Sequence, residues 1–479
     1  MKYIHLIGIC GTGMGSLAGL FKEAGFKVSG SDTQFYPPMG DQIKALEIKL
    51  YTGFDPENLA EKPDIVIIGN VCRADNPEAV EALKLKIKYY SLPQALQEFF
   101  LKNKKAIVVA GTHGKTTTTC LLAWVLTSAG LDPGFLIGGV GLNLGKSFQL
   151  GKGDYFVVEG DEYDSAFFDK GPKFAHYKPA GAILTSLEWD HVDIYPTFEK
   201  MFGAFEKLTA TLSEKTPLLA WMDSPKITEL THMRHYPLFR YGLSHGDYTA
   251  QNIKTEPAGT SFQLCCDDQR VPLFVPLSGR ANLENTIAVA ALCHRIGLSW
   301  EQIAEGLKTF QGIKRRQEIR GTVKGVTVID DFAHHPTAIR RTIEALKERF
   351  PKQRLTAVFE PRSNTSRRNA HYDQYLKAFK GADKVILAPV YNPEKIPAAE
   401  RLDTAKLADD LMKRGIDAYA VDGTDFIIEF ILRGIGPNEV VAFFSNGDFD
   451  NIHEKLLDKL SRRKIFEDKK QVRSIKIRT

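Results

Sequence analysis

The residues best suited to chemistry are GTHGKT, residues 111–116, which follow an apolar run at residues 107–110. A glycine-rich turn between a strand and a helix leaves backbone N–H groups pointing into an open loop, where the helix dipole also favours an anion. The Lys115 ammonium would reach the outer phosphates of a nucleotide, and the Thr116 hydroxyl would bind Mg²⁺. The spacing differs from the general G-x-x-x-x-G-K-[ST] pattern, but strand, glycines, lysine and hydroxyl stand in the required order. The residues therefore predict a phosphate-binding loop.

Two further strand ends carry groups that bind cations. Glu159 is the first carboxylate after the apolar residues 155–158. A carboxylate at the tip of a strand beside a phosphate loop is where nucleotide-dependent enzymes hold Mg²⁺. His191 stands between two aspartates after another apolar run, residues 182–184. From the residues alone, metal binding and a structural role explain this histidine equally well.

The N-terminus has features of a dinucleotide-binding unit. A strand over residues 2–9 is followed by several glycines, a helical stretch and a second strand that ends at Asp32, where such folds place a ribose-binding acid. Only Gly13-x-Gly15-x-x-Ala18 fits the fingerprint spacing, which is a loose match. Binding of NAD and binding of another nucleotide diphosphate both remain open.

After a hinge near residues 312–316, strands and helices alternate, which predicts a parallel sheet covered on both faces. Polar clusters follow three of the strands, at residues 330–335, 360–365 and 445–447. Since ligands of such sheets bind beyond the carboxyl ends of the strands, these clusters predict a binding site. Arg362 is suited to a substrate carboxylate, which a guanidinium binds bidentately, but a surface ion pair explains it equally well.

Two asparagines, Asn282 and Asn285, stand ahead of an alanine-rich helical stretch, residues 286–296. Their side chains could cap that helix or reach the edge of an adenine base. Capping is the simpler interpretation of the residues alone.

The chain has 479 residues, enough for about three domains of ordinary size. With 43% hydrophobic and 25% charged residues, it has the composition of a soluble globular protein. We predict an α/β fold with a Rossmann-like N-terminal domain, a central P-loop domain and a C-terminal Rossmann-like domain with a parallel sheet. The boundaries are placed at residues 1–103, 104–312 and 313–460, followed by a basic tail at 461–479.

The net charge of +5 is concentrated at the C-terminus. Residues 459–479 contain nine Lys or Arg against two acids, a charge of +7 that leaves −2 for residues 1–458. This end is either solvated or an electrostatic contact for an anionic membrane or nucleic acid. The solvated end is the simpler interpretation, so no nucleic-acid partner is expected.

Six cysteines show neither metal-ligand spacing nor a disulfide framework. No apolar run approaches the ~20 residues of a membrane-spanning helix, and the N-terminus is a strand and glycine turn rather than a signal sequence. We therefore expect a cytoplasmic protein with reduced thiols and no stable membrane insertion.

The order of motifs along nearly the whole chain resembles the muramyl ligase family, the ATP-dependent enzymes that form amide bonds in peptidoglycan metabolism. The motifs are GICGTGMG, GTHGKTTT, VVEGDEYD, EWDHVD, GRANLEN and DDFAHHPTAI. The resemblance implies an N-terminal domain for a UDP-sugar, a central ATPase domain and a C-terminal domain for the incoming amine. It also implies the use of ATP and Mg²⁺.

The resemblance further implies roles for individual residues. ATP would be bound by Gly111, Thr112, His113, Gly114, Lys115, Thr116, Thr117, Asn282, Asn285, Arg316 and Asp331. The metal would be bound by Thr116, Glu159 and His191, and the UDP-sugar, rather than NAD, by Gly11, Thr12, Gly13, Met14, Ser31, Asp32 and Asn70. A peptide would be bound by His334, Arg362, Asn364, Ser445 and Asn446, and Lys115, His191 and His334 would take part in catalysis.

Four segments are most similar to one branch of the family, which joins the tripeptide L-Ala-γ-D-Glu-meso-diaminopimelate to UDP-N-acetylmuramate in peptidoglycan recycling. They are YPPM at 36–39, YDSAFFDK at 163–170, EPRSNT at 360–365 and SNGDFDNIH at 445–453. ATP is then expected to activate the muramyl carboxylate as an acyl phosphate, which the peptide amine attacks. The near alternative is a UDP-N-acetylmuramate–L-alanine ligase. More distant alternatives are an NAD-dependent oxidoreductase and a nucleotide-switch module without catalysis.

Overall fold

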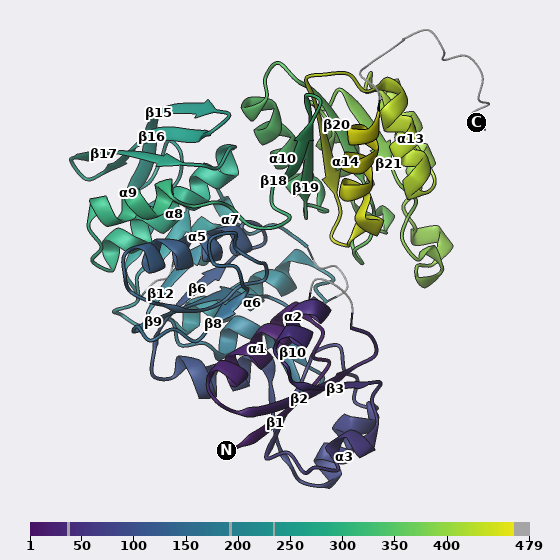
Figure 1. Cartoon of the computed structure of the whole chain (residues 1–479). Coiled ribbons are helices and arrows are strands. Elements are labelled where there is room, and N and C mark those ends of the chain that lie inside the picture. The colour runs from purple at the N-terminus through teal and green to yellow at the C-terminus, as the bar shows by residue number, and fades with distance from the viewer. Residues whose placement is uncertain (36–38, 191–193, 233–234, 464–479) are drawn as a thin grey trace. The chain divides into compact units, whose positions relative to one another are not determined.

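The computed structural model describes residues 1–35, 39–190, 194–232 and 235–463 (Figure 1). The chain divides into two compact units, the first formed by Met1–Lys254 with Ala258–Ile313 and the second by Thr255–Pro257 with Lys314–Thr479. Both units contain mainly parallel sheets covered by helices, so the predicted α/β class is confirmed. The first unit holds two large sheets, and the three predicted domain boundaries remain a prediction.

The first sheet of the first unit is parallel throughout and has the strand order β3-β2-β1-β4-β5. Its elements are β1 Tyr3–Ile7, α1 Thr12–Glu23, β2 Lys27–Asp32, α2 Met39–Ala45, β3 Lys49–Thr52, β4 Ile65–Ile68, α3 Pro77–Lys84, β5 Lys88–Ser91 and α4 Leu92–Leu96. Strands β1 and β4 are buried along their whole length, as expected where helices cover both faces. The chain order reverses between these two neighbouring strands, so their carboxyl ends form the crevice in which such sheets bind ligands.

The second sheet has ten strands in the order β17-β16-β15-β14-β13-β12-β6-β9-β7-β8. Its strands are β6 Lys105–Ala110, β7 Gly134–Leu136, β8 Phe148–Gln149, β9 Tyr155–Gly160, β12 Gly181–Leu184, β13 Leu218–Trp221, β14 Leu238–Tyr241, β15 Tyr248–Glu256, β16 Gly259–Cys266 and β17 Gln269–Val275. Strand β6 lies between β9 and β12 and is parallel to both, so the three strands end at the same edge. A separate small sheet pairs β10 Asp164–Ala166 with β11 Asp169–Pro172.

Helices α5 Lys115–Ser128, α8 Arg280–Arg295 and α9 Trp300–Lys308 pack together in one hydrophobic cluster with the second sheet. Helices α6 Phe198–Ala210 and α7 Pro225–Leu230 belong to a second cluster, which also contains residues of α1 and β9. Helix α8 begins earlier than predicted, so Asn282 and Asn285 lie inside it and their predicted capping role is wrong. The physical reason is Gly279, whose φ of 92° starts the helix without a side-chain cap. The side chain of Asn282 instead donates to Ser278 O at 2.9 Å.

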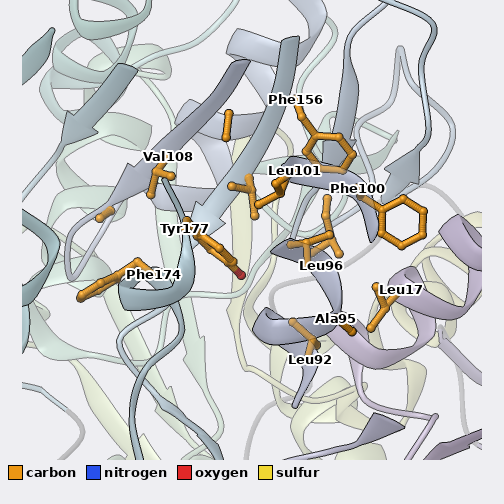
Figure 2. Packing of buried hydrophobic residues seen from close by; sticks show 14 of the residues in the cluster. Leu17, Leu92, Ala95, Leu96, Phe100, Leu101, Val108, Phe156, Phe174 and Tyr177 are labelled. Carbon is orange, nitrogen blue, oxygen red and sulfur yellow. The ribbon is translucent and has the colours of Figure 1, made fainter. Parts of the chain in front are cut away.

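The two sheets of the first unit share one hydrophobic core (Figure 2). Leu17 of α1, Leu96 of α4 and Phe156 of β9 belong to the same buried cluster. A Cβ atom at Gly19 would lie 2.0 Å from the ring of Phe148, so only glycine allows α1 to approach β8 this closely. The two sheets are therefore parts of one packed body.

The second unit is built on a sheet of six strands in the order β18-β19-β23-β20-β21-β22. Its elements are β18 Glu318–Val323, β19 Val326–Asp331, α10 Pro336–Arg349, β20 Arg354–Phe359, α11 Tyr372–Ala378, β21 Lys384–Leu387, α12 Thr404–Lys413, β22 Ala418–Ala420, α13 Thr424–Gly434, β23 Glu439–Phe444 and α14 Ile452–Arg462. Helices α10, α11 and α12 contribute to the core on one face, and α13 and α14 to the core on the other. The sheet is parallel except for β18, an antiparallel edge strand that the sequence analysis does not predict.

In the part of the chain that the structure describes, no helix is both long and apolar enough to span a membrane.

Candidate active site

The predicted phosphate loop joins the end of β6 to the start of α5. Gly111 and Gly114 have φ values of 131° and 84°, which other residues rarely adopt, and a Cβ atom at Gly111 would lie 2.2 Å from Thr185 Oγ1. The N–H of Thr112 donates to Ser186 O at 3.0 Å, and the N–H of His113 donates to Ser186 Oγ at 2.8 Å. The loop is thus fixed against the end of β12. A helix leaves its first N–H groups without intrahelical partners, so those at the start of α5 can bind phosphate.

Lys115, the first residue of α5, turns back over the loop. Its ammonium group donates to Gly111 O at 2.6 Å and to Thr112 O at 3.3 Å. It also lies 2.9 Å from both carboxylate oxygens of Glu162. The Lys115 side chain is 15% exposed and that of Glu162 is 1% exposed, so this ion pair is largely shielded from water. The sequence analysis quotes Glu162 in a motif but gives it no role, because only the fold brings it against Lys115.

Thr116 and Glu159 meet beside the loop. Thr116 Oγ1 donates to Glu159 Oε2 at 3.2 Å, and the N–H of Gly138 donates to Glu159 Oε1 at 2.6 Å. A hydroxyl and a carboxylate oxygen at the end of a strand, next to a phosphate loop, are the ligand types that Mg²⁺ takes in nucleotide sites. The residues present therefore fit the predicted magnesium site.

Two other predicted nucleotide residues, Thr117 and Asn285, lie close to the loop, and His113 lies within it. Thr117 follows Thr116 in the first turn of α5, and a Cβ atom at Gly114 would lie 2.7 Å from Asn285 Oδ1. His113 Nε2 lies 3.5 Å from Glu188 Oε2. His191 lies outside the described residues, so its metal-binding and catalytic roles remain predictions.

The glycine turn of the first sheet is held by Asp32. Gly11, Thr12, Gly13 and Met14 form the turn and the start of α1. Asp32 Oδ2 accepts a hydrogen bond from the N–H of Cys10 at 2.8 Å, and Oδ1 accepts one from the N–H of Thr33 at 2.8 Å. Asn70, which follows β4, is exposed and donates to Asp164 O at 3.3 Å. These residues surround the crevice at the carboxyl ends of β1, β2 and β4.

Ser31 belongs to a buried polar network rather than to the surface of this crevice. Its hydroxyl donates to Glu78, which is completely buried at the start of α3. Glu78 Oε1 also accepts a hydrogen bond from Asn58 Nδ2 at 2.5 Å and lies 3.6 Å from Nε2 of the buried His5. The network fixes the end of β2 beside Asp32. Its signal in the sequence is only an acid in the first turn of a helix, which does not reveal burial.

In the second unit, Asp331 ends β19 and is almost completely buried. Its carboxylate accepts hydrogen bonds from the N–H groups of Gln317 and Ala333, both at 2.8 Å. Burial raises the pKa of Asp331 to about 6, although the nearby Arg316 opposes this shift. The guanidinium of Arg316 lies 4.9 Å from the ring centroid of Phe332. Asp331 and Arg316, which the sequence analysis assigns to ATP, are thus close together.

The predicted peptide residues line the carboxyl ends of β19, β20 and β23. Arg362 Nη1 lies 2.6 Å from Asp448 Oδ1 and 3.7 Å from Glu360 Oε2, and its guanidinium lies 4.0 Å from the ring centroid of Tyr391. Ser445 Oγ donates to Glu360 Oε2 at 2.5 Å. The ion pair foreseen as the alternative interpretation of Arg362 is therefore present. Because Asp448 is more than half exposed, its ion pair with Arg362 does not prevent Arg362 from contacting a ligand.

The remaining members of this set differ in their surroundings. Asn364 Oδ1 accepts a hydrogen bond from Arg367 Nη2 at 2.7 Å, and Arg367 also donates to the carbonyls of Tyr391 and Asn392. Arg367, whose structural role the sequence analysis does not foresee, therefore ties the loops after β20 and β21 together. Asn446 Oδ1 is buried and has no hydrogen-bond partner among the described residues. His334 Nδ1 lies 3.1 Å from Phe332 O.

Three family models match consecutive parts of the chain: the Mur ligase family, catalytic domain, at residues 3–104; the Mur ligase middle domain at residues 109–293; and the Mur ligase, glutamate ligase domain at residues 315–447. The chain belongs to the Mur ligase family, the ATP-dependent ligases that form amide bonds and typically use Mg²⁺.

Several individual members of the family are similar to this chain over nearly its whole length. The chain is 35% identical over 462 residues to the UDP-N-acetylmuramate–L-alanyl-γ-D-glutamyl-meso-2,6-diaminoheptandioate ligase of Haemophilus influenzae, covering 96% of this chain and 99% of that one. It is 31% identical over 461 residues to the UDP-N-acetylmuramate–L-alanine ligase of Acetivibrio thermocellus, covering 95% and 96%. The crystal structure of a murein peptide ligase from Psychrobacter arcticus is 33% identical, with a TM-score of 0.72 and coverage of 97% and 100%.

Proposed function

We propose that the protein joins the tripeptide L-Ala-γ-D-Glu-meso-diaminopimelate to UDP-N-acetylmuramate, with ATP as cosubstrate and Mg²⁺ as cofactor, in the recycling of peptidoglycan in the cytoplasm. The observation that carries the chemistry is the loop at 111–116, with Lys115, Thr116 and Glu159 gathered at the ends of neighbouring strands. The identity over nearly the whole chain to the H. influenzae tripeptide ligase supports the choice of substrates.

The first part of the reaction activates a carboxylate. A carboxylate and an amine do not condense unaided in water, so the lactyl carboxylate takes the γ-phosphoryl group of ATP, and the acyl phosphate provides a good leaving group. Lys115 and the N–H groups at the start of α5 orient the triphosphate and stabilise its charge. Thr116 and Glu159 would hold Mg²⁺, which supplies neutralising charge on the transferring phosphoryl group.

The second part of the reaction places the amine. The carboxyl ends of β19, β20 and β23 bring Arg362, Ser445 and Asn446 to one edge of the sheet, where Arg362 can bind a peptide carboxylate. His334 lies at the same edge and is our candidate for orienting or deprotonating the amine.

The N-terminal crevice would take the UDP-sugar. Asp32 and the N–H groups at the start of α1 form a polar rim at the switch point of a parallel sheet, which suits a nucleotide diphosphate. Membership of the Mur ligase family favours UDP-N-acetylmuramate over NAD at this crevice.

The test is phosphate release from the purified protein with ATP, Mg²⁺ and UDP-N-acetylmuramate, offering the tripeptide and free L-alanine in parallel. We expect turnover with the tripeptide and formation of the UDP-muramyl-tripeptide, identified by its mass. Preference for free L-alanine would support the second candidate, the alanine ligase, which the 31% identity to the A. thermocellus enzyme favours. No dependence on either amine would refute both.

A further inference from the structure

Lys115 has no proton left for a phosphate in this structure. An ammonium group has three protons, and that of Lys115 faces four acceptor oxygens: Gly111 O, Thr112 O and both carboxylate oxygens of Glu162, at 2.6 to 3.3 Å. A phosphate oxygen that binds Lys115 must therefore displace at least one of these acceptors.

Glu162 is the strongest of these competitors. Its two oxygens make charge-assisted contacts with Lys115, whereas the two carbonyl oxygens carry only partial charge. The Glu162 side chain is 1% exposed, so water screens its carboxylate only weakly. The surrounding fold holds the backbone of Glu162 in place, because Tyr195 OH donates to the Glu162 carbonyl oxygen at 2.5 Å.

We propose that Glu162 competes with the nucleotide for Lys115. The carboxylate of Glu162 holds the ammonium group over the loop in the nucleotide-free protein, and an oxygen of the triphosphate replaces it when the nucleotide binds. This proposal rests on the nucleotide-binding role proposed above for the loop. It makes Glu162 a positioning residue that acts through Lys115. The Glu162–Lys115 ion pair weakens the binding of nucleotide in the ground state. It also fixes the position of the ammonium group for phosphoryl transfer.

The proposal predicts an unusual pair of effects for Glu162→Gln. The amide keeps the shape of the side chain but removes the charge that competes with phosphate, so Mg-ADP should bind about tenfold more tightly, measured by titration calorimetry. At the same time kcat should fall, because the ammonium group is less well oriented, so that KM for ATP and kcat decrease together. A purely structural role would instead weaken nucleotide binding.

Two further variants complete the test, one expected to have an intermediate effect and one serving as a control for the loss of a charge. Glu162→Asp keeps the charge but shortens the side chain, so its nucleotide affinity should lie between those of the parent and the Gln variant. Asp154→Asn removes the same charge from an exposed residue just before β9, which pairs with Lys105 rather than with Lys115, and should change the affinity by less than about twofold.

The outcomes separate this proposal from the one on which it rests. If the parent protein does not bind Mg-ADP, the proposed function of the loop fails. If the parent binds it and the folded Gln variant binds it equally or more weakly, the competition by Glu162 is refuted. Should Glu162→Gln fail to fold, weaker binding by Glu162→Asp than by the parent would refute the proposal in the same way.

Discussion

The Lys115–Glu162 pair makes a quantitative prediction about stability as well as about nucleotide binding. Lys115→Met removes the ammonium group but preserves much of the apolar stem, and it leaves the carboxylate of Glu162 buried without its cation. Removal of one partner from a buried pair typically costs about 3–5 kcal/mol. Since Lys115 is 15% exposed, we expect the lower end, about 3 kcal/mol of unfolding free energy.

The double variant Lys115→Met/Glu162→Gln tests the origin of that cost. Replacing the carboxylate by an amide removes the stranded charge, so the double variant should lose only about 1 kcal/mol relative to the parent. Lys173→Met is the matched control. It breaks the neighbouring pair with Asp161, whose side chain is 37% exposed and can be solvated, so it should cost less than Lys115→Met.

The measurement is chemical denaturation followed by tryptophan fluorescence, with phosphate release recorded for each variant. Lys115→Met should also lower kcat by ~10²–10³-fold, because one preorganised charge is lost at the phosphoryl group. Glu162→Gln should not restore that activity in the double variant, although it restores stability. Equal losses of stability in the single and double variants would show that no charge is stranded and would refute the reasoning.

Three further predictions concern the other site residues. Arg362→Ala should weaken tripeptide binding by about tenfold or more while leaving Mg-ADP binding unchanged, since a charged hydrogen bond contributes about 1.5–3 kcal/mol; calorimetry with unchanged peptide affinity would remove Arg362 from the site. Because its folded pKa is raised to about 6, Asp331 contributes stability that is fully present below its unfolded pKa near 4 and is lost as pH rises through 6. Asp331→Asn should therefore flatten the fall in stability between pH 4 and 6, by about 3 kcal/mol, and an unaltered pH profile of unfolding would contradict the assignment. Gly111→Ala should abolish nucleotide binding, because its φ is 131° and its Cβ would collide with Thr185; normal Mg-ADP affinity would contradict the loop geometry.

Elements whose functional residues are adjacent in the chain could be predicted from the sequence. The phosphate loop needs glycines, a lysine and a hydroxyl in order between a strand and a helix, and all of these are adjacent in the chain, so β6 and α5 were located correctly. Asp32 was likewise placed at the end of β2, where its carboxylate now binds the glycine turn.

Features that depend on tertiary packing were not predictable. The UDP-sugar role of Ser31 stays a prediction, but nothing in the sequence indicates that its hydroxyl donates to the buried Glu78, 47 positions further along the chain. Asn282 and Asn285 looked like helix caps because the apolar pattern begins after them, whereas the helix starts after Gly279, six residues before the predicted start at residue 286. Strand β18 was missed because an edge strand with much of its surface exposed lacks the continuous apolar run of its neighbours.

The single core shared by the two sheets of the first unit has a thermodynamic consequence. Leu17, Phe100 and Phe156 lie in one cluster, so the N-terminal sheet cannot separate from the ten-stranded sheet without exposing this apolar surface (Figure 2). The two sheets should therefore melt in one cooperative transition, and a ligand bound at the N-terminal crevice or at the phosphate loop should raise the melting temperature of both. Occupancy by the sugar nucleotide would then stabilise the ten-stranded sheet that carries the phosphate loop, which couples the two substrates through the stability of a common body rather than through direct contact.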